Sequence, residues 1–270
     1  MKRTKLFVIF GLLSLMIAGC SNANDSSLGG DTAGKSTSNK GTEITVSAAA
    51  SLTDALTKVI HQYEKQSNTT VHVNFASSGK LEKQIEQGAP TDVFLSASKS
   101  KMKALLKRNL IDKNHKADLL KNKLVLIIPK GSNKEIQSFA DLKKQTIQKV
   151  AVGIPQTVPA GRYAKETLQT LHLWQPLQKK IVQANDVRQV LRYVEDGNVD
   201  AGIVYKSDAL ISDKVKIIKI AGESTHTPIT YPVAVIAGTN HPKAAISFYK
   251  YLQTKRVLKL FDHYGFSSIH

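Results

Sequence analysis

Small polar residues stand at several points of the sequence where a strand-like run gives way to a helix-like run. In "ITVSAAASLTDAL" an extended apolar run ends in alanines and Ser51 before helical spacing begins, and similar junctions occur at "NFASSGKL", "TVPAGRY" and "QANDVRQV". The N-terminus of a helix carries unpaired N–H donors and a partial positive charge of about half an elementary unit, so it binds anions readily. These junctions therefore indicate an anion site built from hydroxyl and N–H groups.

Each junction also has an ordinary structural explanation. Ser51 followed by Asp54 resembles a capping box, Ser78 can be explained as a helix cap in the same way, and Asp186 is typical of an N-cap. We interpret Asp54 and Asp186 as helix-start residues whose carboxylates face backbone donors. The anion cleft is favoured only because the junctions occur together at the carboxyl ends of strands, where open α/β sheets bind ligands.

The elements that must position these junctions alternate between short β-rich runs and helical patterns. The first elements follow a β-α-β-α-β order, which predicts parallel strands with right-handed crossovers, and the scheme repeats after "KLVLIIPKG". We therefore expect an α/β protein with two lobes, each a mainly parallel sheet flanked by helices. Residues 41–122 and 231–270 are assigned to lobe 1 and residues 123–230 to lobe 2, with "KLVLIIPKG" and "YPVAVIA" interpreted as hinge-crossing strands.

The N-terminus carries the features of an export signal. Three cations precede an apolar run from Leu6 to Ala18, which is shorter than the roughly 20 residues of a membrane-spanning helix. The run ends in "IAGC", which resembles a bacterial lipobox, so we predict a signal peptide over residues 1–19 and lipidation of Cys20. The mature protein would then be anchored by lipid to the extracytoplasmic face of the cell membrane. Because Cys20 is the only cysteine, an intramolecular disulfide and a catalytic cysteine in the body are excluded.

The segment after the cysteine, residues 20–40, is predicted to be a flexible linker. It is rich in Ser, Gly and Asn and has no aromatic residue, so it cannot bury enough apolar surface to fold. Residues 29–36 match the phosphate-loop pattern G-x-x-x-x-G-K-S. That motif binds phosphate only between a strand and a helix, and neither is predicted beside it, so we predict no nucleotide site.

The net charge of the chain is +17, and removal of the three cations of the signal leaves +14. Such a surplus favours anionic partners or an anionic envelope surface. The lysines are scattered along the predicted helices, and no nucleic-acid-binding motif accompanies them. We therefore expect a solvated basic surface and no nucleic-acid partner.

Six motifs, in this order, give the sequence a resemblance to a known family. They are "AAASLTDAL", "NFASSGKL", "GAPTDVFLSA", "VAVGIPQTVPAGRYAKETL", "NDVRQVLRYVEDGNVDAGIVYKSDA" and "YPVAVI". Together, over about residues 43–266, they resemble the periplasmic molybdate-binding proteins of ABC importers. The resemblance implies a type II binding-protein fold, a monomer, and an ABC permease in the membrane as partner. It implies no cofactor and no direct metal ligand, because the oxyanion is held between the lobes through its oxygens.

The resemblance also implies which residues hold the oxyanion. Carried over by motif, they are Ser51, Ser78, Ala160, Val187 and Tyr205, with Ala160 and Val187 contributing main-chain N–H groups. No cationic side chain contacts the oxyanion in that family. One departure is Gly79, where some relatives have a third serine, and we expect it to loosen that turn without removing a donor.

The donor set agrees with the chemistry of the implied ligand. Molybdate at neutral pH is a dianion without a proton, so it needs donors on every side, whereas phosphate retains a proton near neutrality and benefits from a buried acceptor. Tungstate, with almost the same size and charge, is expected to bind too. Sulfate or another tetrahedral oxyanion stays an alternative, because cavity size is not visible in a sequence.

Arg162 and Arg188 each follow a proposed donor. Because the next residue on a helix points about 100° away, we predict that both lie on the surface and steer the anion without gripping it.

A serine hydrolase using Ser51 or Ser78 is the competing hypothesis from another class. It needs a histidine base and an orienting acid, but the eight histidines have no repeated relation to the serine turns. The sequence contains neither a G-x-S-x-G elbow nor an H-E-x-x-H pair. We therefore predict a binding protein and not an enzyme, with capture of the ligand by closure of the two lobes.

Overall fold

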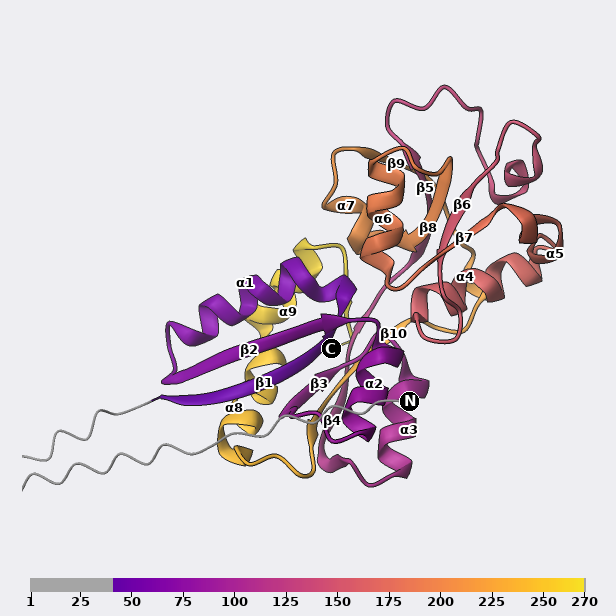
Figure 1. Cartoon of the computed structure of the whole chain (residues 1–270). Coiled ribbons are helices and arrows are strands. Elements are labelled where there is room, and N and C mark those ends of the chain that lie inside the picture. Colours follow the sequence, from indigo (N-terminus) through magenta and orange to yellow (C-terminus); the bar gives the residue numbers. More distant parts are fainter. Residues whose placement is uncertain (1–40, 270) are drawn as a thin grey trace, which may run out of the picture. The chain divides into compact units, whose positions relative to one another are not determined.

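Two β-sheets, each flanked by helices, form the body of the protein in the computed structural model, which describes residues 41–269 (Figure 1). The first sheet has the strand order β11-β4-β10-β3-β1-β2, and the second has the order β7-β6-β8-β5-β9. The strands of the first sheet are β1 (Thr42–Ala49), β2 (Thr69–Ala76), β3 (Val93–Leu95), β4 (Ile111–Lys121), β10 (Thr230–Ile236) and β11 (Ser267–Ser268). Those of the second are β5 (Leu124–Pro129), β6 (Val150–Gly153), β7 (Ile181–Ala184), β8 (Ala201–Tyr205) and β9 (Val215–Ile220).

Both sheets are mixed, whereas mainly parallel sheets were expected. The predicted β-α-β runs do give parallel pairs, β1 with β2 and β3, and β6 with β7 and β8. The strands next to the crossings between the sheets are antiparallel to their neighbours, with β10 between β3 and β4, and β5 between β8 and β9. The long strand β4 was not predicted, because its sequence "IDKNHKADLLK" is mostly polar.

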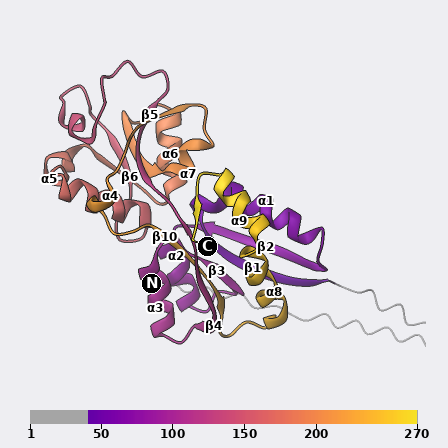
Figure 2. The same cartoon turned by 180° about the vertical axis from the view of Figure 1, so that it is seen from behind.

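The chain crosses between the sheets twice, next to the two strands that were interpreted as hinge-crossing but not within them. β5 lies entirely in the second sheet and β10 entirely in the first, so neither is a hinge-crossing strand. The crossings are instead the connection of residues 122–123 between β4 and β5 and the segment 221–229 between β9 and β10. Figure 2 shows β4 and β10, which are paired, where they approach the second sheet. The predicted lobe boundaries at residues 122/123 and 230/231 stay a proposal.

Helices cover both faces of the first sheet. On one face α1 (Thr53–Glu64) packs beside α8 (Pro242–Leu252) and α9 (Lys255–His263). On the other face α2 (Ser78–Glu86) and α3 (Lys99–Lys107) enclose a separate apolar cluster with the strands (Figure 1). The second sheet is accompanied by α4 (Pro159–Thr170), α5 (Trp174–Leu177), α6 (Val187–Glu195) and α7 (Lys206–Leu210). Short 3-10 helices are η1 (Ala50–Leu52), η2 (Phe139–Lys143), η3 (Gln178–Lys180) and η4 (Glu223–Thr225).

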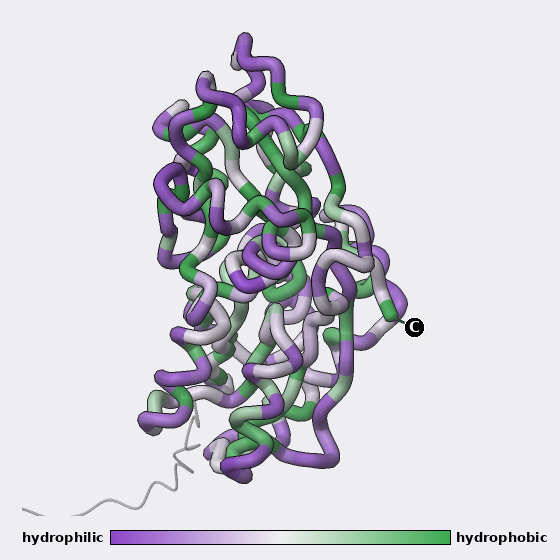
Figure 3. Tube along the Cα trace, turned by 90° about the vertical axis from the view of Figure 1, so that its right-hand side faces the viewer, coloured by the Kyte–Doolittle hydropathy of each residue, from purple (hydrophilic) through white to green (hydrophobic). Residues whose placement is uncertain are grey.

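The core follows the apolar periodicity of the sequence. Helix α6 buries Val187, Val190, Leu191 and Val194, the stripe at three- and four-residue spacing that packs on the sheet. Strand β10 is buried along its whole length, as a strand covered on both faces should be. Figure 3 shows the hydrophobic residues gathered along the inner strands and the hydrophilic ones on the outer turns.

None of the helices within residues 41–269 is both long enough and apolar enough to cross a membrane. The predicted signal peptide, Cys20 and the linker lie outside the described residues.

Candidate oxyanion-binding site

A small cavity between the two sheets brings the five predicted site residues together. It is lined by Ala49, Ala50, Ser51, Ser77, Ser78, Ala97, Val158, Pro159, Ala160, Val187 and Tyr205. Their role in binding stays a prediction, but their convergence is a property of the fold.

Strand ends and helix starts supply these residues. Ser51 lies in η1 between β1 and α1, Ser78 is the first residue of α2, and Tyr205 is the last residue of β8. Ala160 and Val187 lie in the first turns of α4 and α6, where N–H groups lack an intrahelical acceptor. All five residues are almost completely buried, so the donors that they carry face the cavity and not bulk water.

The start of α4 comes unusually close to the end of β6. A Cβ atom on Gly161 would collide with the carbonyl oxygen of Gly153, so only glycine allows this approach. Pro159 occupies the first turn of the same helix, where its missing N–H is no loss. The sequence "PAG" therefore fixes the position of the Ala160 N–H at the cavity.

The two serines are not helix caps, which corrects the ordinary explanation of these positions. Neither α1 nor α2 has a side-chain cap. The Ser51 hydroxyl instead lies 2.8 Å from the Tyr231 hydroxyl, and the Ser78 hydroxyl oxygen accepts a hydrogen bond of 2.9 Å from the Ala97 N–H. The predicted cap at Asp186 is confirmed, since its carboxylate accepts from the Gln189 N–H at 2.8 Å.

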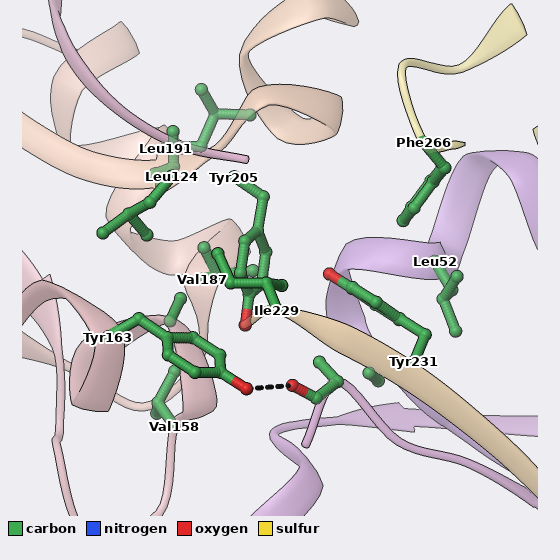
Figure 4. Packing of buried hydrophobic residues seen from close by; sticks show 14 of the residues in the cluster. Leu52, Leu124, Val158, Tyr163, Val187, Leu191, Tyr205, Ile229, Tyr231 and Phe266 are labelled. Carbon is green, nitrogen blue, oxygen red and sulfur yellow. Dashed lines mark hydrogen bonds between the residues drawn. The ribbon is translucent and has the colours of Figure 1, made fainter. Parts of the chain in front are cut away.

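Tyr205 offers a buried hydroxyl that has no hydrogen-bond partner among the described residues. Its ring lies between those of Tyr163 and Tyr231, with centroid distances of 6.4 and 5.8 Å (Figure 4). Burial raises the pKa of Tyr205 well above its usual value. The phenol therefore keeps its hydrogen at neutral pH and can donate it to a ligand.

The charged residues near the site lie behind its walls, since none of the residues lining the cavity is charged. The Arg188 side chain is only 16% exposed and forms ion pairs with Asp54 on α1 and Asp208 on α7. The prediction that Arg188 steers the anion from the surface is therefore wrong. The interpretation of Asp54 as a carboxylate facing backbone donors is also wrong, because the guanidinium of Arg188, on helix α6 beside the second sheet, binds it.

Asp208 is completely buried behind Tyr205. Its Oδ1 lies 3.1 Å from Arg188 Nε, but the two atoms are not aligned for a hydrogen bond. Burial therefore dominates over the nearby guanidinium and raises the pKa of Asp208 to about 7. Its other oxygen accepts a long hydrogen bond of 3.3 Å from the Tyr205 N–H, so Asp208 supports the end of β8.

Arg162 is likewise engaged within the protein. It binds Glu166 at 2.5 Å and Thr227 at 3.1 Å, and its guanidinium lies 4.4 Å from the centre of the Tyr163 ring. A side chain held in this way is poorly suited to the predicted steering role.

At Gly79 the backbones of the two lobes are in direct contact. Its N–H donates a 2.9 Å hydrogen bond to the carbonyl oxygen of Thr157, which precedes α4. A Cβ atom on Gly79 would lie 2.5 Å from that oxygen. The glycine was expected to loosen its turn, but in the structure it permits contact across the cleft.

Two residues beside the site were missed from the sequence. Tyr231 was placed only in a strand, and Asn122 in the first crossing received no role. The Asn122 side chain donates a hydrogen bond to the Tyr231 hydroxyl, which is in turn hydrogen-bonded to the Ser51 hydroxyl. Since these residues are more than 70 positions away from Ser51, local spacing could not reveal the contact. No group of three or more His, Cys, Asp or Glu residues suited to a metal ion occurs in residues 41–269.

The two-sheet fold with a donor-lined cavity between the sheets defines a solute-binding protein of the type II class. The comparison with family models agrees, because residues 44–267 match the bacterial extracellular solute-binding protein family. The chain belongs to this family of solute-binding proteins.

Individual relatives and solved structures show which members of the family the chain is similar to. The chain is 44% identical to a putative ABC transporter substrate-binding lipoprotein, YvgL, of Bacillus subtilis, over 99% of both chains. It is 40% identical to the molybdate-binding protein ModA of Escherichia coli, over 83% of this chain and 89% of the relative. The substrate-binding domain of a putative molybdenum ABC transporter from Clostridium difficile superposes with a TM-score of 0.66 at 41% identity, covering 85% of this chain and all of that domain.

Proposed function

We propose that this protein captures molybdate, and also tungstate, between its two lobes and delivers it to an ABC permease. The observation that carries the proposal is the convergence of Ser51, Ser78, Ala160, Val187 and Tyr205 on one uncharged cavity. Uncharged donors without a carboxylate suit a tetrahedral dianion that has no proton to donate. The molybdate-binding relatives, at 40% identity, support the same ligand.

Capture rests on closure of the lobes around the ligand. Ser51 and Ser78 belong to the first sheet with its helices, whereas Ala160, Val187 and Tyr205 belong to the second. A ligand that completes this donor set binds the closed state more tightly than the open one, and so favours closure. The permease would then recognise the closed form. Delivery from a lipid anchor at Cys20, on the extracytoplasmic face of the membrane, is part of the same proposal and is supported by a relative named as a lipoprotein.

Calorimetric titration of the purified protein with molybdate, tungstate, sulfate and phosphate tests the proposal. We expect tight binding of molybdate and tungstate, weaker binding of sulfate and the weakest binding of phosphate. X-ray scattering in parallel should show a smaller radius of gyration with molybdate. Tighter binding of sulfate than of molybdate would overturn the proposed ligand, and an unchanged radius would overturn capture by closure.

A further inference from the structure

A chain of hydrogen bonds leads from the hinge to the Ser51 hydroxyl. It begins at Asn122, in the first crossing, and passes through Tyr231 at the start of β10. The direction of each bond can be assigned, because one end of the chain is fixed by the backbone.

The amide of Asn122 has only one consistent orientation. The Lys123 N–H donates to Asn122 Oδ1 at 2.8 Å, so the NH₂ group lies on the opposite side. There Nδ2 lies 2.9 Å from Ser207 Oγ and 3.3 Å from Tyr231 Oη. The reverse orientation would place two donors, the NH₂ group and the Lys123 N–H, against each other.

The orientation of Asn122 determines the direction of the next bond. An NH₂ group only donates, so the Tyr231 oxygen accepts and the Tyr231 hydrogen is left for another partner. The neighbouring oxygen of Ser51, 2.8 Å away, is the acceptor in reach. Complete burial keeps Tyr231 protonated, because it raises the pKa of the phenol well above its usual value.

Ser51 therefore accepts from Tyr231, and its own hydrogen is free for the cavity. Ser78 is in the same state, because its oxygen accepts from the Ala97 N–H. Both serines thus present hydrogens to a ligand. A ligand oxygen that itself carries a hydrogen would require one of these hydroxyls to turn and give up its internal bond.

We propose that Asn122 and Tyr231 are positioning residues that determine the oxyanion specificity of the site by holding the Ser51 hydroxyl as a donor. This inference rests on the proposed function and adds two residues to it. It assigns the discrimination against protonated oxyanions to residues that do not touch the ligand.

A double-mutant cycle on molybdate affinity tests the Tyr231 step. We expect Tyr231→Phe to weaken binding about tenfold in the natural background, in line with a hydrogen bond to a charged group. In the Ser51→Ala background the same change should weaken binding less than about twofold, because no hydroxyl remains to be oriented. Equal losses in both backgrounds would overturn the proposal and indicate a general packing effect. Failure of the unaltered protein to bind molybdate would instead contradict the proposed function.

Asn122→Asp tests the direction of the chain. A carboxylate cannot donate a hydrogen bond to Tyr231, so the Tyr231 hydroxyl should instead donate to the new carboxylate. The Ser51 hydroxyl should then donate to the Tyr231 oxygen. As a result, Ser51 would present a lone pair to the cavity and not a hydrogen. Competition against molybdate at pH 8 compares sulfate with hydrogen phosphate, which have the same charge but differ by one proton. We expect the preference for sulfate to fall about tenfold or more. The added negative charge weakens the binding of both anions about equally, because both carry two charges. Its effect therefore cancels in the ratio of the two affinities. The exposed Asn114→Asp is the matched control, and an unchanged ratio in Asn122→Asp would overturn the assigned direction.

Discussion

At the scale of single residues, Tyr205 is the proposed donor whose hydroxyl the fold leaves without a hydrogen-bond partner among the described residues. Its hydroxyl is buried beside the cavity without a partner among residues 41–269, which is a costly arrangement for a polar group unless a ligand completes it. The hydroxyl should therefore contribute to binding more than to folding.

Tyr205→Phe should accordingly weaken molybdate binding about 10- to 100-fold, because a hydrogen bond to a charged group is lost. The stability of the ligand-free protein should change little or rise, since the variant removes an unpaired buried group. Calorimetry and urea unfolding measure the two effects. Tyr63→Phe, a buried tyrosine bonded to Ser247 away from the cavity, is the control. An unchanged affinity would exclude Tyr205 from the donor set.

The buried carboxyl group of Asp208 should make the stability of the protein depend on pH. Its pKa is about 7 in the folded protein, compared with 3.8 for an aspartate side chain exposed to water. The folded state therefore binds the proton more tightly than the unfolded state does. The stability that this protonation contributes is fully present below pH 4 and is lost as the pH rises through 7. Asp186 and Arg188 are the charged groups that act on it.

Asp208→Asn should therefore remove a fall in the free energy of unfolding between pH 4 and 7, with a slope of at most about 1.4 kcal/mol per pH unit. Urea unfolding at several pH values measures the difference between variant and unaltered protein. The exposed Asp213→Asn should leave the slope as it is. Parallel curves for Asp208→Asn would show that the fold does not raise the pKa of Asp208.

At the scale of elements, the start of α2 decides how closely the lobes can meet. The Gly79 N–H binds the Thr157 carbonyl oxygen, and a side chain at this point would push against backbone that cannot move aside. We therefore expect the proposed closure to depend on the identity of residue 79.

Gly79→Ala should weaken molybdate binding about tenfold, because the added methyl group opposes the closed state by an overpacking cost of about 1–3 kcal/mol. Scattering should show incomplete contraction with ligand. Gly131→Ala, where nothing lies within 4 Å of the new methyl group, is the control. Full affinity and full contraction in the variant would contradict the role of Gly79.

Most elements, and the convergence of the five predicted donors on one cavity, could be predicted from the sequence, for different reasons. Parallel β-α units and the α6 stripe have local periodicities, and the fold brings the predicted donors together because helices start at the ends of neighbouring strands. Strand β4 was missed because its polar sequence carries no clear alternation, so its antiparallel pairs with β10 and β11 were not predicted. The pair of Asp54 with Arg188 joins residues 134 positions apart, and no spacing rule predicts such a contact.

At the scale of the whole molecule, Arg188 connects the lobes. It stands on α6 beside the buried Asp208 of its own lobe and reaches Asp54 on α1 of the other. The proposed opening of the cleft would break the pair with Asp54 and keep the pair with Asp208, so we expect the guanidinium to act as a latch for the closed state.

Asp54→Asn should speed the dissociation of molybdate about two- to fivefold and leave association nearly unchanged. The effect is modest because Asp54 is 45% exposed and its ion pair is screened by water. Stopped-flow measurements at low and high salt test this, since salt should reduce the difference. Asp118→Asn, which breaks a pair with Lys99 on the surface of a single lobe, is the matched control. A slower association with unchanged dissociation would restore the steering role of the arginine.

The two crossings have a consequence for the order in which the protein is made. Strands β5 to β9 are contiguous in the chain, so the second sheet is complete once β9 has left the ribosome. Strand β10, which separates β3 from β4 in the first sheet, is synthesised only afterwards. The lobe that begins first along the chain is therefore completed last in the sequence, because β3 and β4 cannot pair with β10 until the chain has returned from the second sheet.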